Sequence, residues 1–201
     1  MTEKNGPWTI RGRREVYQNP WITLDHHDVI DANGDDGVYG VVRFANLAIG
    51  ILPLFEDGTV PLVGQHRFTF DAFSWELPEG GGAKDVPPED TARRELAEET
   101  GLRAKNWHHL GESHISNSVT DEVAHYFLAW DLIQGELSPD GCEVFSHRRV
   151  PFSTLVAECM EGKISDCLTL LMVQTAILKA QSELLPPRPT DIILGQYEKS
   201  L

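Results

Sequence analysis

The chain has 201 residues, 41% apolar and 24% charged, which suits one globular domain with short extensions. Its formal net charge of −14 excludes non-specific binding to DNA or RNA, which requires a basic surface. An anionic substrate is still compatible with this charge, because bound metal ions reverse the sign of the local field.

The cysteines and the start of the chain indicate where the protein works. Cys142, Cys159 and Cys167 form no CxxC pair, and their odd number favours reduced thiols. The opening MTEKNGPW lacks a signal pattern, and no apolar run approaches the roughly 18 residues of a membrane-spanning helix. We therefore expect a cytoplasmic protein with no membrane partner.

The first half of the chain is rich in strand signals. Candidate strands at 21–30 and 38–44 flank DANGDDG, whose Asn-Gly and Asp-Gly steps mark a tight turn. Candidate strands at 46–55 and 60–68 flank EDG, which predicts a second hairpin. A short strand at 73–77 then leads into the glycine-rich loop PEGGGAKDVPP.

A helical pattern follows from Pro88 to about Thr100. Glu89 and Asp90 lie near its positive N-terminal end, and Gly101 is placed to end it. Beyond it the pattern predicts further strands and then two helices, at 107–116, 123–130 and 143–151 for the strands and about 151–161 and 165–184 for the helices.

Pro186 prevents the last helix from continuing, so 185–201 is expected to be a tail that docks on the domain or stays mobile. Many strands with few helices predict an α+β fold, with a mixed β-sheet sandwiched between helices. Neither G-x-G-x-x-G nor G-x-x-x-x-G-K-[ST] is present, so neither of these nucleotide-binding motifs is indicated.

The stretch RRELAEETGL (93–102) gathers carboxylates on one face of the predicted helix. Glu95, Glu98 and Glu99 are spaced i, i+3 and i+4. Like charges at this spacing destabilise a helix by a few tenths of a kcal/mol per pair, so a bound divalent cation would offset the repulsion. Taken alone, the stretch also suits a solvated amphipathic helix with i,i+4 ion pairs.

The longer stretch GGGAKDVPPEDTARRELAEETGL (80–102) resembles the Nudix box, G-x5-E-x7-R-E-U-x-E-E-x-G-U, where U is a bulky aliphatic residue. Val86 stands where the pattern has its first glutamate. Counting from Gly80, the other fixed positions are matched by Arg94, Glu95, Leu96, Glu98, Glu99, Gly101 and Leu102. The resemblance implies a Nudix hydrolase with an α/β/α sandwich.

The resemblance also implies a metal centre. Its ligands would be the carboxylates of Glu95, Glu98 and Glu99, helped by the backbone carbonyl of Glu79. Carboxylate oxygens suit Mg²⁺ (or Mn²⁺), which would neutralise the phosphates, activate water and stabilise the leaving group. Of these residues, Glu98 is also assigned to the catalytic machinery.

Three residues of the same loop and helix have implied supporting roles. Arg94 would brace the loop within the catalytic machinery. Gly80 and Gly81 would let the backbone approach metal and phosphate closely, because glycine has no side chain.

Outside the box, REVYQNPWITL, GQHRF (64–68) and WELPEGGG (75–82) resemble the ADP-ribose pyrophosphatase branch, over most of 8–180. This implies hydrolysis of ADP-ribose to AMP and ribose 5-phosphate. It also implies a homodimer formed through the N-terminal strands. Arg67 would neighbour the phosphate or metal site, and Glu76 would lie at the substrate site.

We accordingly divide the chain into an N-terminal β extension (1–45) that dimerises, a Nudix domain (46–184) and a tail (185–201). Trp8 and Trp21 are candidate adenine stackers, since an aromatic plane suits any base, although a tryptophan is more often structural.

The base that activates water is sought outside the box. Glu143, in SPDGCEVF, is the favoured candidate, because it corresponds to a glutamate that often serves as base in this branch. Glu122, in VTDE, lies where related enzymes use an acidic residue near substrate or metal. Either residue could instead be an ordinary loop carboxylate.

The substrate has alternatives. The segment HISNSVTDE (114–122) lacks the proline typical of the ADP-ribose branch, so GDP-mannose, other nucleotide sugars and dinucleotides such as NADH stay open. A more distant alternative is a sensor that binds a nucleotide without cleaving it. Val86 favours the sensor, whereas the complete R-E-L-x-E-E segment disfavours it.

Overall fold

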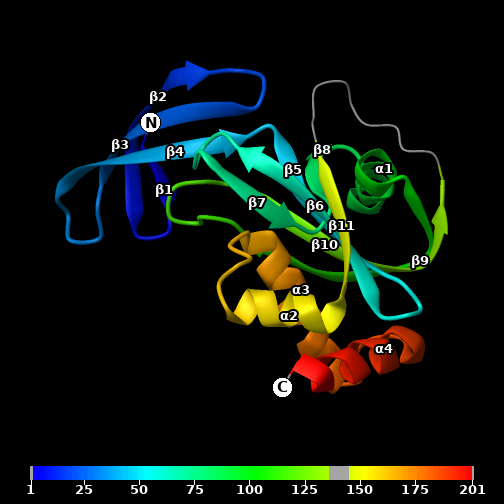
Figure 1. Cartoon of the computed structure of the whole chain (residues 1–201). Coiled ribbons are helices and arrows are strands. Elements are labelled where there is room, and N and C mark those ends of the chain that lie inside the picture. Colours follow the sequence, from blue (N-terminus) through cyan, green and yellow to red (C-terminus); the bar gives the residue numbers. More distant parts are fainter. Residues whose placement is uncertain (1, 136–144, 201) are drawn as a thin grey trace. The chain divides into compact units, whose positions relative to one another are not determined.

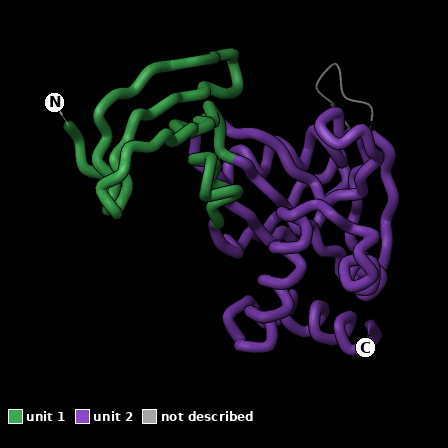
Figure 2. Tube along the Cα trace, turned by 90° about the vertical axis from the view of Figure 1, so that its left-hand side faces the viewer, with its two compact units in different colours: residues 1–47, 83–85, 113–123 green, residues 48–82, 86–112, 124–201 purple. Residues whose placement is uncertain are grey.

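The computed structural model describes residues 2–135 and 145–200 (Figure 1). The chain divides into two compact units, coloured separately in Figure 2. Unit 1 comprises residues 1–47, 83–85 and 113–123, and unit 2 comprises 48–82, 86–112 and 124–201.

Unit 1 is built on a four-stranded antiparallel sheet in the order β1-β2-β3-β4. Its strands are β1 (Glu3–Asn5), β2 (Trp8–Gln18), β3 (Ile22–Ile30) and β4 (Asp36–Phe44). Antiparallel pairing of β3 with β4 confirms the hairpin predicted around DANGDDG. The Asp31 carboxylate accepts hydrogen bonds from the amides of Asn33 (2.8 Å) and Asp35 (2.9 Å), which holds the turn.

Asp25 cross-links this sheet. It lies on the central strand β3 with 2% of its surface exposed. Nε of Arg43, on β4, donates to Asp25 Oδ2 at 2.7 Å, and Arg13 donates to the same oxygen from β2. The Arg43 hydrogen bond is the largest cause of a lowered Asp25 pKa, which the Arg13 pair lowers further against the opposing effect of burial. The carboxylate therefore stays charged and ties together three strands.

Unit 2 contains two sheets, with strand orders β8-β5-β10-β9 and β11-β6-β7. The first includes a parallel pair, in which Ala124 on β10 lies opposite Ala48 on β5. In the second, β6 pairs antiparallel with both β7 and β11. The strands are β5 (Asn46–Leu54), β6 (Thr59–Arg67), β7 (Ala72–Glu76), β8 (Glu79–Ala83), β9 (Leu102–His114), β10 (Val123–Gln134) and β11 (Ser146–Pro151).

The second predicted hairpin, between 46–55 and 60–68, is wrong. A tight turn is present, with the Phe55 amide donating to the Thr59 carbonyl at 3.0 Å and Gly58 at φ 77°. The two strands nevertheless belong to different sheets. Both strands are largely buried, and β5 lies between β8 and β10, whereas β6 lies between β11 and the following strand β7.

The helices confirm most of the local predictions. α1 (Pro88–Thr100) ends at Gly101, whose left-handed φ of 68° and amide bond to the Ala97 carbonyl form the expected cap. Helices α2 (Phe152–Met160) and α3 (Cys167–Gln181) lie within the two predicted ranges. Among the described helices, none combines the length and apolar character that crossing a membrane requires.

The tail forms a helix of its own, which the sequence reading did not include. α3 ends before Pro186, as expected, but α4 (Pro187–Tyr197) follows, and a short 3-10 turn (Glu198–Ser200) completes the described chain. Proline is favoured at the first helical position, so Pro187 starts a helix here. Ile193 of α4 is fully buried, and α2, α3 and α4 cluster together away from α1 (Figure 1).

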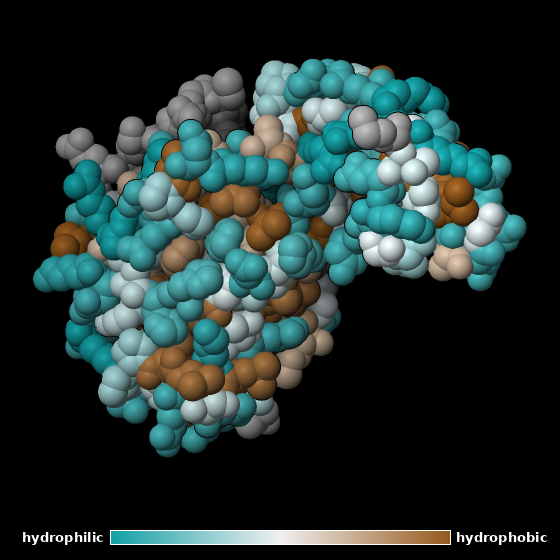
Figure 3. All heavy atoms as spheres, turned by 180° about the vertical axis from the view of Figure 1, so that it is seen from behind, coloured by the Kyte–Doolittle hydropathy of each residue, from teal (hydrophilic) through white to brown (hydrophobic). Residues whose placement is uncertain are grey.

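The core of unit 2 consists of aliphatic side chains from its strands and helices, including Ile51, Leu52, Leu62, Leu77, Leu96, Leu128, Leu155 and Met172. On the face drawn in Figure 3, hydrophobic side chains form separate patches among hydrophilic ones. The buried apolar set therefore holds the strands and helices that carry the polar groups of the site.

We predict that Asp25→Asn destabilises unit 1 by about 2–3 kcal/mol at pH 7, because two charge-assisted hydrogen bonds are weakened. The Asp25 pKa is lower in the folded than in the unfolded state, so its contribution is present above about pH 4 and is lost as pH falls through the folded pKa. The gap between the proteins in urea unfolding should therefore shrink below about pH 4.

Asp28→Asn on the same strand is the matched control, because the Asp28 side chain is 61% exposed. Equal stability of Asp25→Asn and wild type at pH 7 would contradict the prediction.

Candidate active site

The glycine loop and the helix α1 are in direct contact. A Cβ at Gly80 would overlap the Glu95 carboxylate, and one at Gly82 would lie 2.5 Å from Oγ1 of Thr91. Glycine at these two positions lets β8 lie directly against α1. The glycines thus serve the contact between β8 and α1, and their expected approach to metal and phosphate stays a prediction.

Arg94 organises this contact. Its Nη2 donates to Glu95 Oε1 at 2.6 Å and to the carbonyl of Gly81 at 3.0 Å, and its Nη1 donates to Glu98. One guanidinium thus joins two of the proposed metal ligands to the loop. The bracing role expected for Arg94 is consistent with these contacts, and they also separate the negative charges on this helix face.

Val86, at the position of the absent first glutamate, is 39% exposed. The nearest acidic alternative on the helix, Glu89, pairs with Arg93 at 2.6 Å. In this chain Arg94 is therefore held by its own helix neighbours and the loop carbonyl.

Glu99, the third glutamate of the box helix, also contacts the loop. Glu99 is 4% exposed, and its Oε2 accepts a hydrogen bond from the Glu79 amide at 3.0 Å. The Glu99 carbonyl also contacts Nε2 of His147 on β11 at 2.5 Å. Glu99 thus connects the end of α1 to both the loop and a second strand.

Arg67 lies at the centre of a second group of charges. Its Nε donates to Glu76 Oε1 at 2.9 Å, and its Nη2 donates to Glu76 Oε2 and to Glu79 Oε1. Burial alone would lower the Arg67 pKa, but its bonds to Glu76 and the charge of Glu79 raise that pKa above its usual value. Arg67 and Glu76, both expected near the substrate, therefore lie together as a charged pair.

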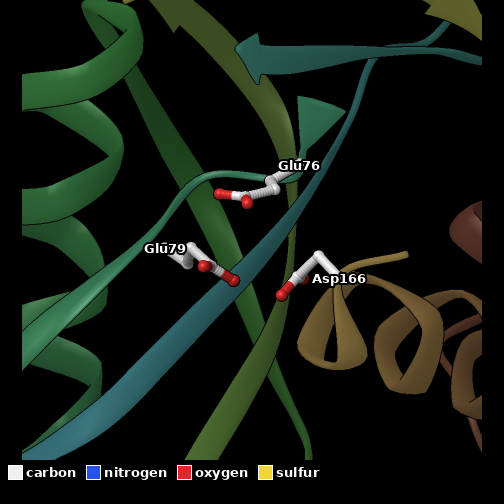
Figure 4. Close-up of side chains that lie close together, drawn as sticks. All are labelled: Glu76, Glu79 and Asp166. Atoms are coloured by element: carbon white, nitrogen blue, oxygen red, sulfur yellow. The ribbon is translucent and has the colours of Figure 1, made fainter. Parts of the chain in front are cut away.

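Asp166 completes this group, which we call the acidic cluster: Glu76, Glu79 and Asp166 (Figure 4). One ligand oxygen from each lies within 4.8 Å of the others. Burial is the largest cause of a raised Glu79 pKa, with the charges of Asp166 and Glu76 adding to it and Arg67 opposing it.

Sequence reasoning missed two members of the cluster. Asp166 is the N-cap of α3. An aspartate before a helix predicts a cap, but it does not indicate that the side chain lies near Glu76 and Glu79. Glu79 was expected to act only through its backbone carbonyl, whereas its side chain joins the cluster.

The donor set fits a hard divalent cation. Glu95 and Glu99 are buried carboxylates beside a glycine loop, and oxygen ligands suit Mg²⁺ and Mn²⁺. Within residues 2–135 and 145–200, the acidic cluster is the only set of three His, Cys, Asp or Glu side chains gathered within 4.8 Å. The helix glutamates are spread more widely, because Arg94 lies between two of them.

The other candidates are placed differently. Glu143 lies outside the described residues. Glu122 belongs to unit 1, where burial, followed by the charge of Asp121, raises its pKa. Trp8, also in unit 1, packs edge-on against Tyr39 with ring centroids 5.5 Å apart and lines a cleft of about 460 Å³, whereas Trp21 is 67% exposed.

Comparison with known proteins identifies the family. Residues 45–169 match the family model described as NUDIX domain. Residues 8–42 match the model described as nucleoside diphosphate sugar hydrolase N-terminal domain. The chain belongs to the Nudix family, as the motif predicted.

Several curated proteins are similar to this chain. A CMP-5'-(N-acetyl-N-hydroxy-3-aminopropyl)phosphonate hydrolase of Streptomyces rubellomurinus is 34% identical to this chain. The aligned stretch covers 64% of this chain and 63% of that protein. An ADP-ribose pyrophosphatase of Bacillus subtilis is 29% identical, and the alignment covers 79% of this chain and 80% of that protein. A GDP-mannose pyrophosphatase of Yersinia enterocolitica is 28% identical, with 82% and 92% covered.

A solved structure shares the fold. The crystal structure of an ADP compounds hydrolase superposes with a TM-score of 0.77 at 20% identity, covering 89% of this chain and 98% of that one. The α+β fold, with a mixed sheet, helices and strands that precede the Nudix core, is confirmed.

We predict that Gly82→Ala destabilises unit 2 by about 1–3 kcal/mol, because the new methyl group meets Thr91, which is buried and stiff about χ1. Gly80→Ala should cost less than about 1 kcal/mol, since the Glu95 carboxylate at the end of a flexible side chain can move away.

Thermal unfolding of the two variants checks this order, and Gly195→Ala, where no atom lies within 4 Å of the added carbon, is the control. A larger loss of stability for Gly80→Ala than for Gly82→Ala would contradict it.

Proposed function

We propose that the protein hydrolyses the pyrophosphate bond of a nucleoside diphosphate linked to another group, and that ADP-ribose, cleaved to AMP and ribose 5-phosphate, is its preferred substrate. The observation that carries the proposal is the Nudix helix α1, which sets the carboxylates of Glu95 and Glu99 against the glycine loop. The ADP-ribose pyrophosphatase of Bacillus subtilis, similar over most of both chains, supports the choice of substrate.

The metal ligands in this proposal are Glu95, Glu98 and Glu99 with the backbone carbonyl of Glu79. When bound there, Mg²⁺ (or Mn²⁺) would supply the positive charge that neutralises the phosphates and activates water. Arg94 keeps Glu95 and Glu98 on the loop side of the helix through its bond to the Gly81 carbonyl. Glu99 accepts a hydrogen bond from the Glu79 amide and so anchors the backbone at the residue whose carbonyl is the proposed ligand.

Further roles extend the site. Arg67 would face the phosphates, while its bonds to Glu76 and Glu79 hold the guanidinium in place. A fixed guanidinium suits phosphate recognition, because it is always charged and presents several donors. Glu76 would thus act on substrate through Arg67.

The proposed base is Glu143, and Glu122 is the alternative. The raised pKa of Glu122 brings it closer to the range in which a carboxylate accepts protons at neutral pH. Trp8 is the better-placed adenine stacker of the two tryptophans in its own unit, because it lines a cleft, whereas Trp21 is exposed on the surface.

GDP-mannose is the second candidate substrate. The GDP-mannose pyrophosphatase of Yersinia enterocolitica matches this chain over 92% of its own length, and the N-terminal match is to a nucleoside diphosphate sugar hydrolase domain.

Purified protein with Mg²⁺ should release AMP faster from ADP-ribose than it cleaves GDP-mannose, ADP-glucose or NADH. Chromatography of the products measures the order directly, and binding of these ligands without any product would favour the sensor.

We predict that Glu98→Gln lowers kcat by at least about 100-fold with little change in stability, because a charged group of the catalytic helix is lost. Glu89→Gln is the matched control on the same helix, since the Glu89 side chain is 45% exposed and pairs with Arg93. Turnover of Glu98→Gln at the wild-type rate, with Mg²⁺ still required, would contradict the assignment.

We further propose that the N-terminal extension, 1–45, forms a homodimer and that the protein works in the cytoplasm. Large apolar side chains on the extension are exposed in one chain, at Val16, Tyr17, Trp21 and Val38. Cys159 and Cys167 are free thiols, which agrees with a reducing compartment.

We predict that multi-angle light scattering of the wild-type protein gives twice the chain mass and that Val16→Glu lowers this mass toward that of one chain. A monomeric wild type would contradict the proposed homodimer.

A further inference from the structure

The acidic cluster draws its carboxylates from three separate places in unit 2. Glu76 ends β7, Glu79 begins β8, and Asp166 caps the N-terminus of α3. In Figure 4 the three side chains point toward one another from the β7–β8 turn and from the start of the helix. The fold therefore brings negative groups together that sequence spacing would keep apart.

The charge of the cluster is not balanced by its protein partners. Arg67 pairs with Glu76 and Glu79, and Asp166 has no ion pair among the described residues. Three carboxylates thus share one guanidinium. Glu76 is 2% exposed, and surplus charge in such surroundings is unfavourable unless a further positive group compensates it.

Within the part of the chain that the structure describes, one oxygen of the cluster has no hydrogen-bond partner. Oε1 of Glu79 accepts from Arg67, but Oε2 of the same carboxylate is buried and has no hydrogen-bond partner in the described chain. On Asp166, Oδ2 accepts from the Thr169 amide at 2.6 Å, which leaves Oδ1 available. A buried, unpartnered carboxylate oxygen beside a second available one is the arrangement that a cation would satisfy.

We propose that the acidic cluster binds a hard divalent cation, Mg²⁺ or Mn²⁺, between Glu79 Oε2 and Asp166, with Glu76 and Arg67 as its surroundings. A charge of +2 matches the excess of three carboxylates over one guanidinium. The donors are all carboxylate oxygens, with no histidine or cysteine among them, which favours these ions over zinc.

This cation site is separate from the glutamates of α1. Glu79 contacts Glu99 through its backbone amide, whereas its side chain turns toward Asp166. Glu76 and Asp166 lie outside the Nudix box, on β7 and at the start of α3. The proposal uses the Glu79 side chain, whereas the proposed function uses the backbone carbonyl of that residue, so the two can be tested apart in a protein impaired at Glu98.

The test counts bound Mn²⁺ by the electron paramagnetic resonance signal of the free ion, in a Glu98→Gln background. Asp166→Asn is the decisive change, because asparagine still caps a helix through its side-chain oxygen while the charge is lost. Asp191→Asn, at an exposed position on α4, is the matched control. Glu79→Gln tests the unpartnered oxygen.

We expect Glu98→Gln to retain an Mn²⁺ ion that Asp166→Asn and Glu79→Gln each weaken at least tenfold, with Asp191→Asn unchanged. Mn²⁺ should also raise the Tm of the background protein and raise it less in Asp166→Asn, which holds even if that variant is somewhat less stable. The same number of ions at the same affinity in all four proteins would overturn the proposal and leave a proton on Glu79 as the compensating group.

Discussion

The contact between the glycine loop and α1 is the constraint on which the site depends. Because Gly80 and Gly82 carry no side chain, the backbone of β8 lies against the helix, and polar groups on both sides can pair. Arg94 reaches a loop carbonyl, and Glu99 receives a loop amide. These contacts join the loop to the helix, and Gly80, Arg94 and Glu99, which take part in them, are fixed positions of the Nudix pattern.

The two units differ in how the charge of their buried acids is balanced. In unit 1, Asp25 is shared by Arg13 and Arg43, and Arg43 also pairs with Asp121, so two guanidiniums face two carboxylates. In unit 2, the acidic cluster pairs only with Arg67 among the described residues, so negative charge exceeds positive charge there. The first arrangement is complete and stabilises a sheet. The second leaves a deficit that a ligand can fill, which is why we regard one as structural and the other as a binding site.

Local signals in the sequence predicted the parts of the fold that local physics decides. The bounds of α1, its glycine cap and the first hairpin follow from turn residues and helix caps, so they were predictable. The separation of β5 and β6 into different sheets was not, because β5 pairs with β8 and β10 and β6 pairs with β11, all of which are distant in the sequence. The helix α4 was missed because its prolines indicate an end to one helix as much as the start of another.

The site divides in the same way. The spacing of Arg94, Glu95, Glu98 and Glu99 identified the family because all four lie on one helix. Asp166 meets Glu76 and Glu79 only through the packing of α3 beneath the β7–β8 turn, where the Leu77 amide donates to the buried Thr169 hydroxyl at 2.9 Å. Because tertiary packing brings Asp166 to this cluster, no regular spacing in the sequence predicts that it lies beside Glu76 and Glu79.

The C-terminal helices also set where this chain can be cut. The family match ends at residue 169, within the first turn of α3, yet Met172 and Ala176 of that helix and Ile193 of α4 are fully buried. A fragment trimmed to the family boundary would lose these side chains and expose the aliphatic surface that they cover. Anyone who exchanges this domain between proteins should therefore carry the chain through α4, since the recognisable family segment is shorter than the folding unit.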